Sequence, residues 1–101
     1  MENTGEIYSF HVQKINELEK LALQTSNRTI SSIENAVATW DAAGEKPFEL
    51  EPDILRLKNV HGKLCAWEIK MLRSMGRADL HDRIHLLEQF SAIFNEIAVM
   101  I

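Results

Sequence analysis

This chain has few of the residues that interrupt or cross-link a polypeptide. Its 101 residues include one cysteine, two prolines and four glycines. The single cysteine, Cys65, excludes an internal disulfide, and the small number of prolines and glycines argues against a low-complexity or disordered segment. We therefore expect one ordered domain that covers residues 1–101.

A long hydrophobic run is also missing. The longest uninterrupted apolar segment is residues 97–101, about a quarter of the length that a membrane-spanning helix needs. The first residues lack the basic-then-apolar pattern of a secretory signal. We expect a cytoplasmic protein that does not bind a membrane.

No catalytic motif, metal signature or nucleotide-binding loop is evident in the sequence. His81 and His85 are four residues apart, as are His61 and Cys65, a spacing that places two potential metal ligands on one helix face. In the antiparallel hairpin predicted below, the two pairs would be separated by roughly 13 Å, far more than ligands of one metal allow. We therefore expect no enzymatic activity, no cofactor and no metal site within one chain, and leave open a metal site across a dimer.

Helix-period hydrophobicity fills most of the chain and predicts an all-α fold. The pattern indicates three main helices: a long first one from about Glu6 to Ala43, and two shorter ones at about 52–75 and 79–101. The short turn between the last two predicts an antiparallel hairpin. In the loop at 44–51, Phe48 and Leu50 are expected to fold back as apolar plugs.

The middle of the first block leaves two alternatives. Residues 24–32 are rich in Thr, Ser and Asn, whose side chains compete with helical hydrogen bonds. The block is either one helix of roughly 38 residues, near 57 Å long, or two helices with a break between Ser26 and Ser31. We favour the continuous helix, because apolar positions keep a spacing of three and four residues through this stretch.

A continuous first helix predicts self-association. The second and third helices would span only roughly 36 and 33 Å, so the first would project about 20 Å beyond them at its N-terminal end. That end and the apolar C-terminus are surfaces that need cover, and we predict a homodimer. A broken helix would instead allow a four-helix monomer. The predicted apolar contact residues are Ile7, Tyr8, Phe10, Ile15 and Ile101.

Charge is distributed unevenly along the chain. Residues 1–53 hold ten acidic and four basic side chains, and residues 54–101 hold five acidic and seven basic ones, giving −6 and +2 within the total of −4. The second helix carries a basic stripe of four residues at intervals of seven: Arg56, Lys63, Lys70 and Arg77. This stripe is either a solvated helix face or a docking surface for an acidic partner. Nucleic acid is a less favoured partner, because the overall charge is negative.

These observations favour a small protein-binding regulator or adaptor, of the anti-activator, secretion-chaperone or regulatory-subunit type, that acts through helix-mediated contacts. One alternative is an enzyme or small-ligand protein with a polar pocket, which several charged side chains buried at facing levels would indicate. Another is a nucleic-acid-binding regulator. The protein partner is not identified by the sequence.

Overall fold

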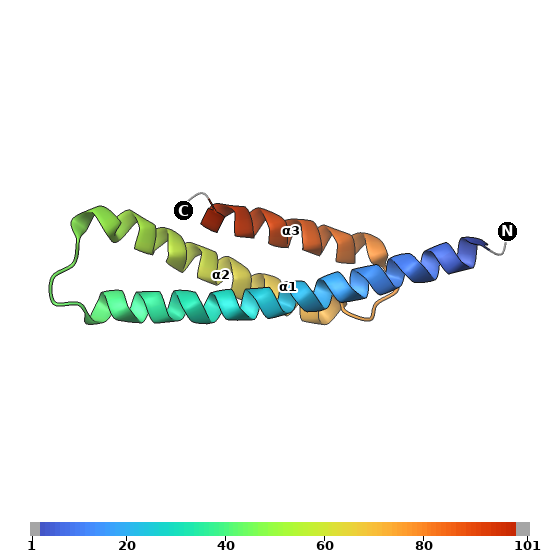
Figure 1. Cartoon of the computed structure of the whole chain (residues 1–101), viewed down its shortest axis with the longest axis horizontal. Helices are drawn as coiled ribbons and strands as arrows, with labels where there is room; N and C mark the ends of the chain where they lie inside the picture. Colours follow the sequence, from blue (N-terminus) through green and yellow to red (C-terminus); the bar gives the residue numbers. More distant parts are fainter. Residues whose placement is uncertain (1–2, 99–101) are drawn as a thin grey trace.

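The computed structural model is an elongated bundle of three helices. It describes residues 3–98, with side chains from residue 11 onward, and measures 67 × 22 × 16 Å. Figure 1 shows the long helix α1, Asn3–Ala42, beside an antiparallel hairpin of α2, Glu51–Ser74, and α3, Leu80–Ala98. A 3₁₀ turn, Phe48–Leu50, precedes α2. The predicted all-α architecture with a long first helix is confirmed.

Helix α1 is continuous through its Thr- and Ser-rich middle. The hydroxyl of Thr25 donates a hydrogen bond to the carbonyl of Leu21 at 2.9 Å, and the hydroxyl of Thr29 donates to the carbonyl of Thr25 at 2.7 Å. Each hydroxyl thus bonds to the carbonyl four residues earlier, an arrangement that is compatible with a helix. The alternative of a break between Ser26 and Ser31 is therefore wrong.

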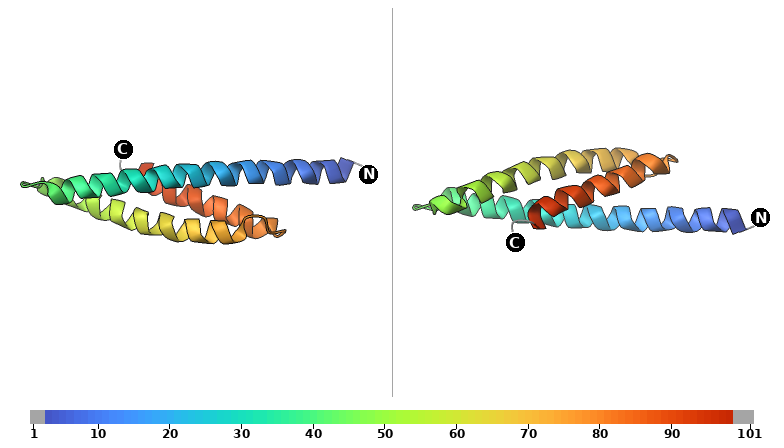
Figure 2. Two further views of the ribbon diagram at one scale, coloured as in Figure 1. Left: turned by 90° about the horizontal axis from the view of Figure 1, so that it is seen from below. Right: turned by 90° about the horizontal axis from the view of Figure 1, so that it is seen from above.

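The N-terminal part of α1 projects beyond the turn between α2 and α3, as all three views in Figures 1 and 2 show. The side chains of Ile7, Tyr8 and Phe10 lie outside the described residues, as does Ile101. Ile15 was expected on the open surface of the projecting end, but its side chain is only 8 % exposed. That expectation is wrong, because the hairpin reaches far enough along α1 to cover this position.

The core consists of two groups of apolar side chains along α2. One group contains Ala22, Trp67, Met71 and Leu86, and the other contains Ile33, Val60 and Leu64. Phe90 and Ile93 of α3 pack against both groups. The indole nitrogen of Trp67 donates a hydrogen bond to the carbonyl of Leu86 at 2.6 Å, so the polar edge of this buried ring is satisfied. Helix α2 is therefore the central element on which α1 and α3 pack.

The loop between α1 and α2 differs from the prediction. Phe48 is 81 % exposed and Leu50 is 47 % exposed, so neither side chain is an apolar plug. The amide of Leu50 donates a hydrogen bond to the carbonyl of Pro47, which closes the 3₁₀ turn. Because this turn leads directly into α2, the segment has too little length to fold back onto the core.

Two residues determine the turn between α2 and α3: one ends α2 and the other caps the start of α3. Gly76 has a φ of +79°, a conformation that glycine adopts without a steric penalty and that commonly ends a helix. Asp79 accepts hydrogen bonds at its side-chain oxygen from the amides of His81 and Asp82, and so caps the start of α3. The reversal positions the end of α2 beside the start of α3.

Candidate protein-binding groove

The predicted basic stripe divides into three parts in the structure. Arg56 is exposed near the start of α2. Lys63 donates from its Nζ to Oε1 of Glu96 on α3 at 2.6 Å, so its charge is already paired. Lys70 and Arg77 both line a groove between α2 and α3, close to the turn. Lys63 and Lys70 line a neighbouring groove of about 370 Å³ between the same two helices.

This groove, called here the basic groove, has a volume of about 400 Å³. Residues of α2 and the following turn form one wall, and residues of α3 form the other. Its lining consists of Lys70, Arg73, Ser74 and Arg77 on the first wall and Asp82, His85, Leu86 and Gln89 on the second. Arg73 and His85 were not predicted as members of this site.

The basic groove contains more positive than negative charge. Among the residues that the structure describes, Lys70, Arg73 and Arg77 form no ion pair with a carboxylate. Asp82 is the one acidic residue of the lining. His85 lies 4.0 Å from the carboxylate of Glu88, outside the lining. Three cations that lack an acidic partner therefore stand along one wall of the groove.

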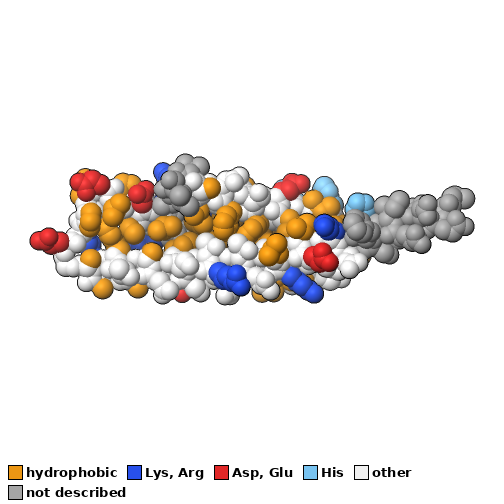
Figure 3. All heavy atoms as spheres, viewed as in Figure 1, with side chains coloured by type: hydrophobic (Ala, Val, Ile, Leu, Met, Phe, Trp, Pro, Cys, Tyr) orange, Lys and Arg blue, Asp and Glu red, His pale blue; other side chains and the backbone are white. Residues whose placement is uncertain are grey.

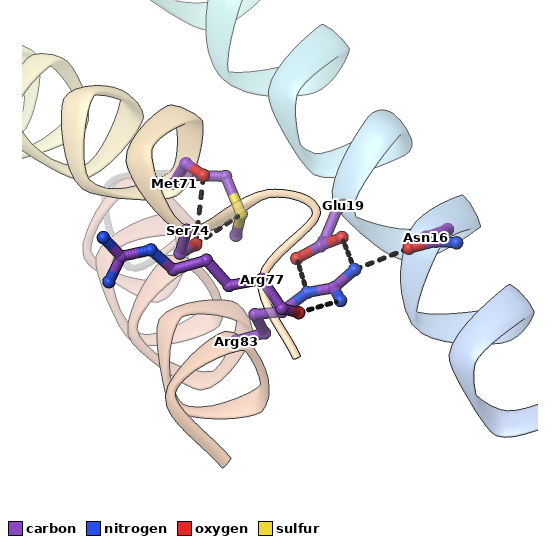
Figure 4. Close-up of polar contacts among 6 residues, drawn as sticks. All are labelled: Asn16, Glu19, Met71, Ser74, Arg77 and Arg83. Carbon is purple, nitrogen blue, oxygen red and sulfur yellow. Dashed lines mark hydrogen bonds and ion pairs between the residues drawn. The ribbon is translucent and has the colours of Figure 1, made fainter. Parts of the chain in front are cut away.

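A buried polar cluster lies beneath the turn (Figure 4). Arg83 of α3 donates from Nε to Oε2 of Glu19 at 2.9 Å and from Nη2 to Oε1 of Glu19 at 2.6 Å. It also donates to the side-chain oxygen of Asn16 and, at 2.8 Å, to the backbone carbonyl of Arg77. In Figure 4 the side chain of Arg77 points away from this cluster. Arg83 thus fixes the turn to α1 and leaves the Arg77 cation free to face the groove.

Charged side chains buried on facing helices were expected to indicate a polar ligand pocket. Glu19 and Arg83 meet this description, because they are only 1 % and 3 % exposed. Both carboxylate oxygens of Glu19 accept hydrogen bonds from Arg83. Two further donors of Arg83 bond to the side-chain oxygen of Asn16 and to the carbonyl of Arg77. The two charges are satisfied by each other, so this pair supports a structural role and not a ligand pocket.

The candidate metal ligands do not converge within the described residues. His61 and Cys65 lie on α2 with their ring nitrogen and sulfur 3.9 Å apart, and Nε2 of His61 lies 3.0 Å from Oε1 of Glu34. His81 and His85 lie on α3, where His85 lines the basic groove. No three His, Cys, Asp or Glu side chains of the described region are arranged as metal ligands. Burial raises the pKa of the Cys65 thiol, and the carboxylates of Glu68 and Glu34 raise it further.

A second groove, between α1 and α3, is largely apolar. It has a volume of about 250 Å³ and is lined by Leu18, Leu21, Ala22, Thr25, Leu87 and Phe90. Figure 3 shows hydrophobic side chains gathered along the middle of this face. Acidic and basic side chains both lie around it, so charge does not indicate the chemistry of an occupant.

Comparison with known proteins gives no match: no family model, curated protein or solved structure is similar to this chain. None of the described helices combines the length and apolar composition needed to cross a bilayer. Functional arguments therefore rest on the grooves themselves.

Proposed function

We propose that this protein is a small adaptor that binds an acidic helical segment of another protein in the basic groove. The observation that carries the proposal is the row of three unpaired cations, Lys70, Arg73 and Arg77, along one wall of a groove of about 400 Å³. The chain as a whole has a net charge of −4, whereas residues 54–101, which contain this site, have a net charge of +2.

The spacing of the cations favours an elongated ligand. Lys70 and Arg73 are three residues apart on one side of the last turns of α2, and Arg77 lies in the turn that follows Gly76; all three line the same wall of the groove. A partner helix with carboxylates three or four residues apart can place one carboxylate near Lys70 and another near Arg73. The groove therefore fits a helix that carries a row of acidic side chains.

A protein partner is favoured over nucleic acid. Ten acidic side chains lie in residues 1–53 against four basic ones, and the long-range field of an acidic protein repels a polyanion. The lining of the basic groove contains no Phe, Tyr or Trp side chain on which a base could stack. Short-range complementarity with a few carboxylates needs no positive charge on the rest of the protein.

The test uses a fluorescently labelled, alanine-based peptide whose three glutamates are separated by three and four residues. We expect it to bind the wild-type protein, with an affinity that falls as salt is added. The variant Lys70→Glu/Arg77→Glu should weaken binding at least about tenfold, because two attractions become repulsions. The matched control Lys20→Glu/Arg28→Glu changes the net charge equally on exposed sites of α1 and should bind like the wild type.

Three results would contradict the proposal. Equal weakening by both double variants would mean that net charge, and not the groove, determines binding. Equal binding of a peptide with the same glutamates in scattered positions would exclude recognition of a helical row. A DNA duplex that binds more tightly than the peptide and is lost in the Lys70→Glu/Arg77→Glu variant would assign the groove to nucleic acid.

A further inference from the structure

Helix α2 carries two rows of residues with helical spacing, one buried and one exposed. The buried row contains Val60, Leu64, Trp67 and Met71. The exposed row, called here the outer seam, alternates steps of three and four residues, the spacing of helices that pair along their length. The outer seam consists of Leu55, Lys58, Gly62, Cys65, Ile69 and Leu72, of which Cys65 is half-buried and the others are exposed.

The large side chains of the outer seam lie in solvent. Leu55 is 60 % exposed, Ile69 is 53 % exposed and Leu72 is 62 % exposed. The seam faces away from the core, because the opposite side of α2 carries the buried row. At Gly62, in the middle of the seam, no neighbouring atom lies within 4 Å of the place where a Cβ would stand. The seam is therefore an open, partly apolar helix face with a small residue at its centre.

The order of residues along the outer seam is self-complementary when a second copy runs antiparallel. If Gly62 of one copy lies opposite Cys65 of the other, then Leu55 lies opposite Leu72 and Lys58 lies opposite Ile69. Every seam position then has a partner, as a two-fold axis requires. The two large leucines meet at each end, and the small Gly62 and Cys65 allow a close approach at the centre.

Charge favours the antiparallel over the parallel direction. Glu51 in the first turn of α2 lies on the same face as Leu55, and Arg73 in the last turn follows Leu72. Neither forms an ion pair with another residue that the structure describes. Antiparallel pairing brings Glu51 of each copy towards Arg73 of the other and sets the helix dipoles in opposite directions. Parallel pairing would align like charges.

We infer that the outer seam is a homodimer interface in which two α2 helices pack antiparallel. The homodimer expected from the sequence thus receives a specific interface, distinct from the projecting end of α1. This inference is argued from the outer seam and does not rest on the adaptor function. The two sites share Arg73, which lines the basic groove and would lie near Glu51 of the other copy, whereas Lys70, Ser74 and the α3 wall of the groove lie off the seam.

The first experiment measures mass by light scattering over a dilution series. The wild type should form a dimer, and Ile69→Lys, which would lie opposite Lys58 of the other copy, and Leu72→Glu should each raise the dissociation constant about a hundredfold, since each occurs twice in the interface. The controls Leu21→Glu and Ile84→Glu alter side chains that are 59 % and 42 % exposed on α1 and α3, and they should leave the dimer intact. Circular dichroism verifies that each variant is folded. A wild-type monomer at all concentrations, or a dimer that Leu72→Glu leaves unchanged, would overturn the inference.

The second experiment tests the direction of pairing by disulfide formation in a Cys65→Ser background. With Leu55→Cys and Leu72→Cys in the same chain, mild oxidation should join the two copies. Leu72→Cys alone should not do so, because the two positions would lie roughly 25 Å apart across the dimer. Cross-linking by Leu72→Cys alone would show parallel pairing, and no cross-linking of the double variant would exclude this interface.

Discussion

Arg83 and Glu19, which are 64 residues apart in the sequence, form a bidentate ion pair that joins α3 to α1. Both side chains are almost fully buried. Helices α1 and α3 contact each other less than either contacts α2, so fewer contacts fix their relative position. The bidentate ion pair has a defined geometry and therefore constrains how α1 and α3 lie relative to each other. We infer that it sets the register between the two helices.

Removing one partner of this pair should destabilise the protein strongly. Arg83→Met leaves the Glu19 carboxylate buried without its partner, and we expect a loss of about 3–5 kcal/mol in the free energy of unfolding. Glu19→Leu combined with Arg83→Met removes both charges and should recover much of that loss. Urea denaturation of the single and double variants measures the coupling.

The matched control for this cycle is Glu96→Gln, which breaks the more exposed pair between Lys63 and Glu96. Its cost should be less than about 1 kcal/mol. If Arg83→Met cost no more than Glu96→Gln, the register role of the buried pair would have to be abandoned.

Ser26 of α1 should be a site where substitution by alanine stabilises the protein. Its hydroxyl oxygen is buried and has no hydrogen-bond partner. Ser26→Ala removes this unsatisfied group and improves helix propensity, whereas Ser31→Ala on the exposed side of the same helix changes propensity alone. We expect thermal or urea unfolding to show Ser26→Ala to be more stable than Ser31→Ala by about 1 kcal/mol. Equal effects would mean that the buried hydroxyl costs nothing.

The positions of the helices could be predicted from local sequence patterns. The buried ion pair between Glu19 and Arg83 could not. Apolar spacing and the short turn with Gly76 predict the hairpin directly. Glu19 lies four residues after Ile15, and Arg83 three before Leu86, so spacing alone places both on core faces. A charged side chain is normally expected outside, and only tertiary pairing permits its burial. The helical spacing of Glu19 and Arg83 relative to neighbouring core residues was the one signal in the sequence that pointed to their burial.

The basic groove could be predicted only in part for a related reason. Lys70 and Arg77 share a seven-residue spacing that the sequence shows, but Arg73 lies off that stripe. His85 joins the site through the register of α3 against α2. A seven-residue interval also selected Arg56 and Lys63, one distant from the groove and the other paired with Glu96. The periodicity of a single helix cannot predict which residues of two helices will line a groove between them.

Two glycines should respond oppositely to substitution by alanine. Gly62 lies inside α2 with open space around it, so Gly62→Ala should increase the stability of the monomer by about 1 kcal/mol through helix propensity. Gly76 has a positive φ, and Gly76→Ala should decrease stability by about 1 kcal/mol. Urea unfolding at high dilution separates these effects from self-association. A stabilising Gly76→Ala would contradict the left-handed turn.

The alkylation of Cys65 should require a higher pH than that of an unstructured cysteine. Only the thiolate reacts, and burial together with the Glu68 and Glu34 carboxylates disfavours that negative form, so the pKa of Cys65 lies above its ordinary value of 9.0. The iodoacetamide rate should therefore keep rising at pH values where a cysteine-containing peptide has reached its plateau. Glu68→Gln removes one of the two negative charges and should shift the profile to lower pH, and unfolding in urea should bring it to that of the peptide. A wild-type profile that coincides with the peptide would show that the thiol is not shielded by the fold.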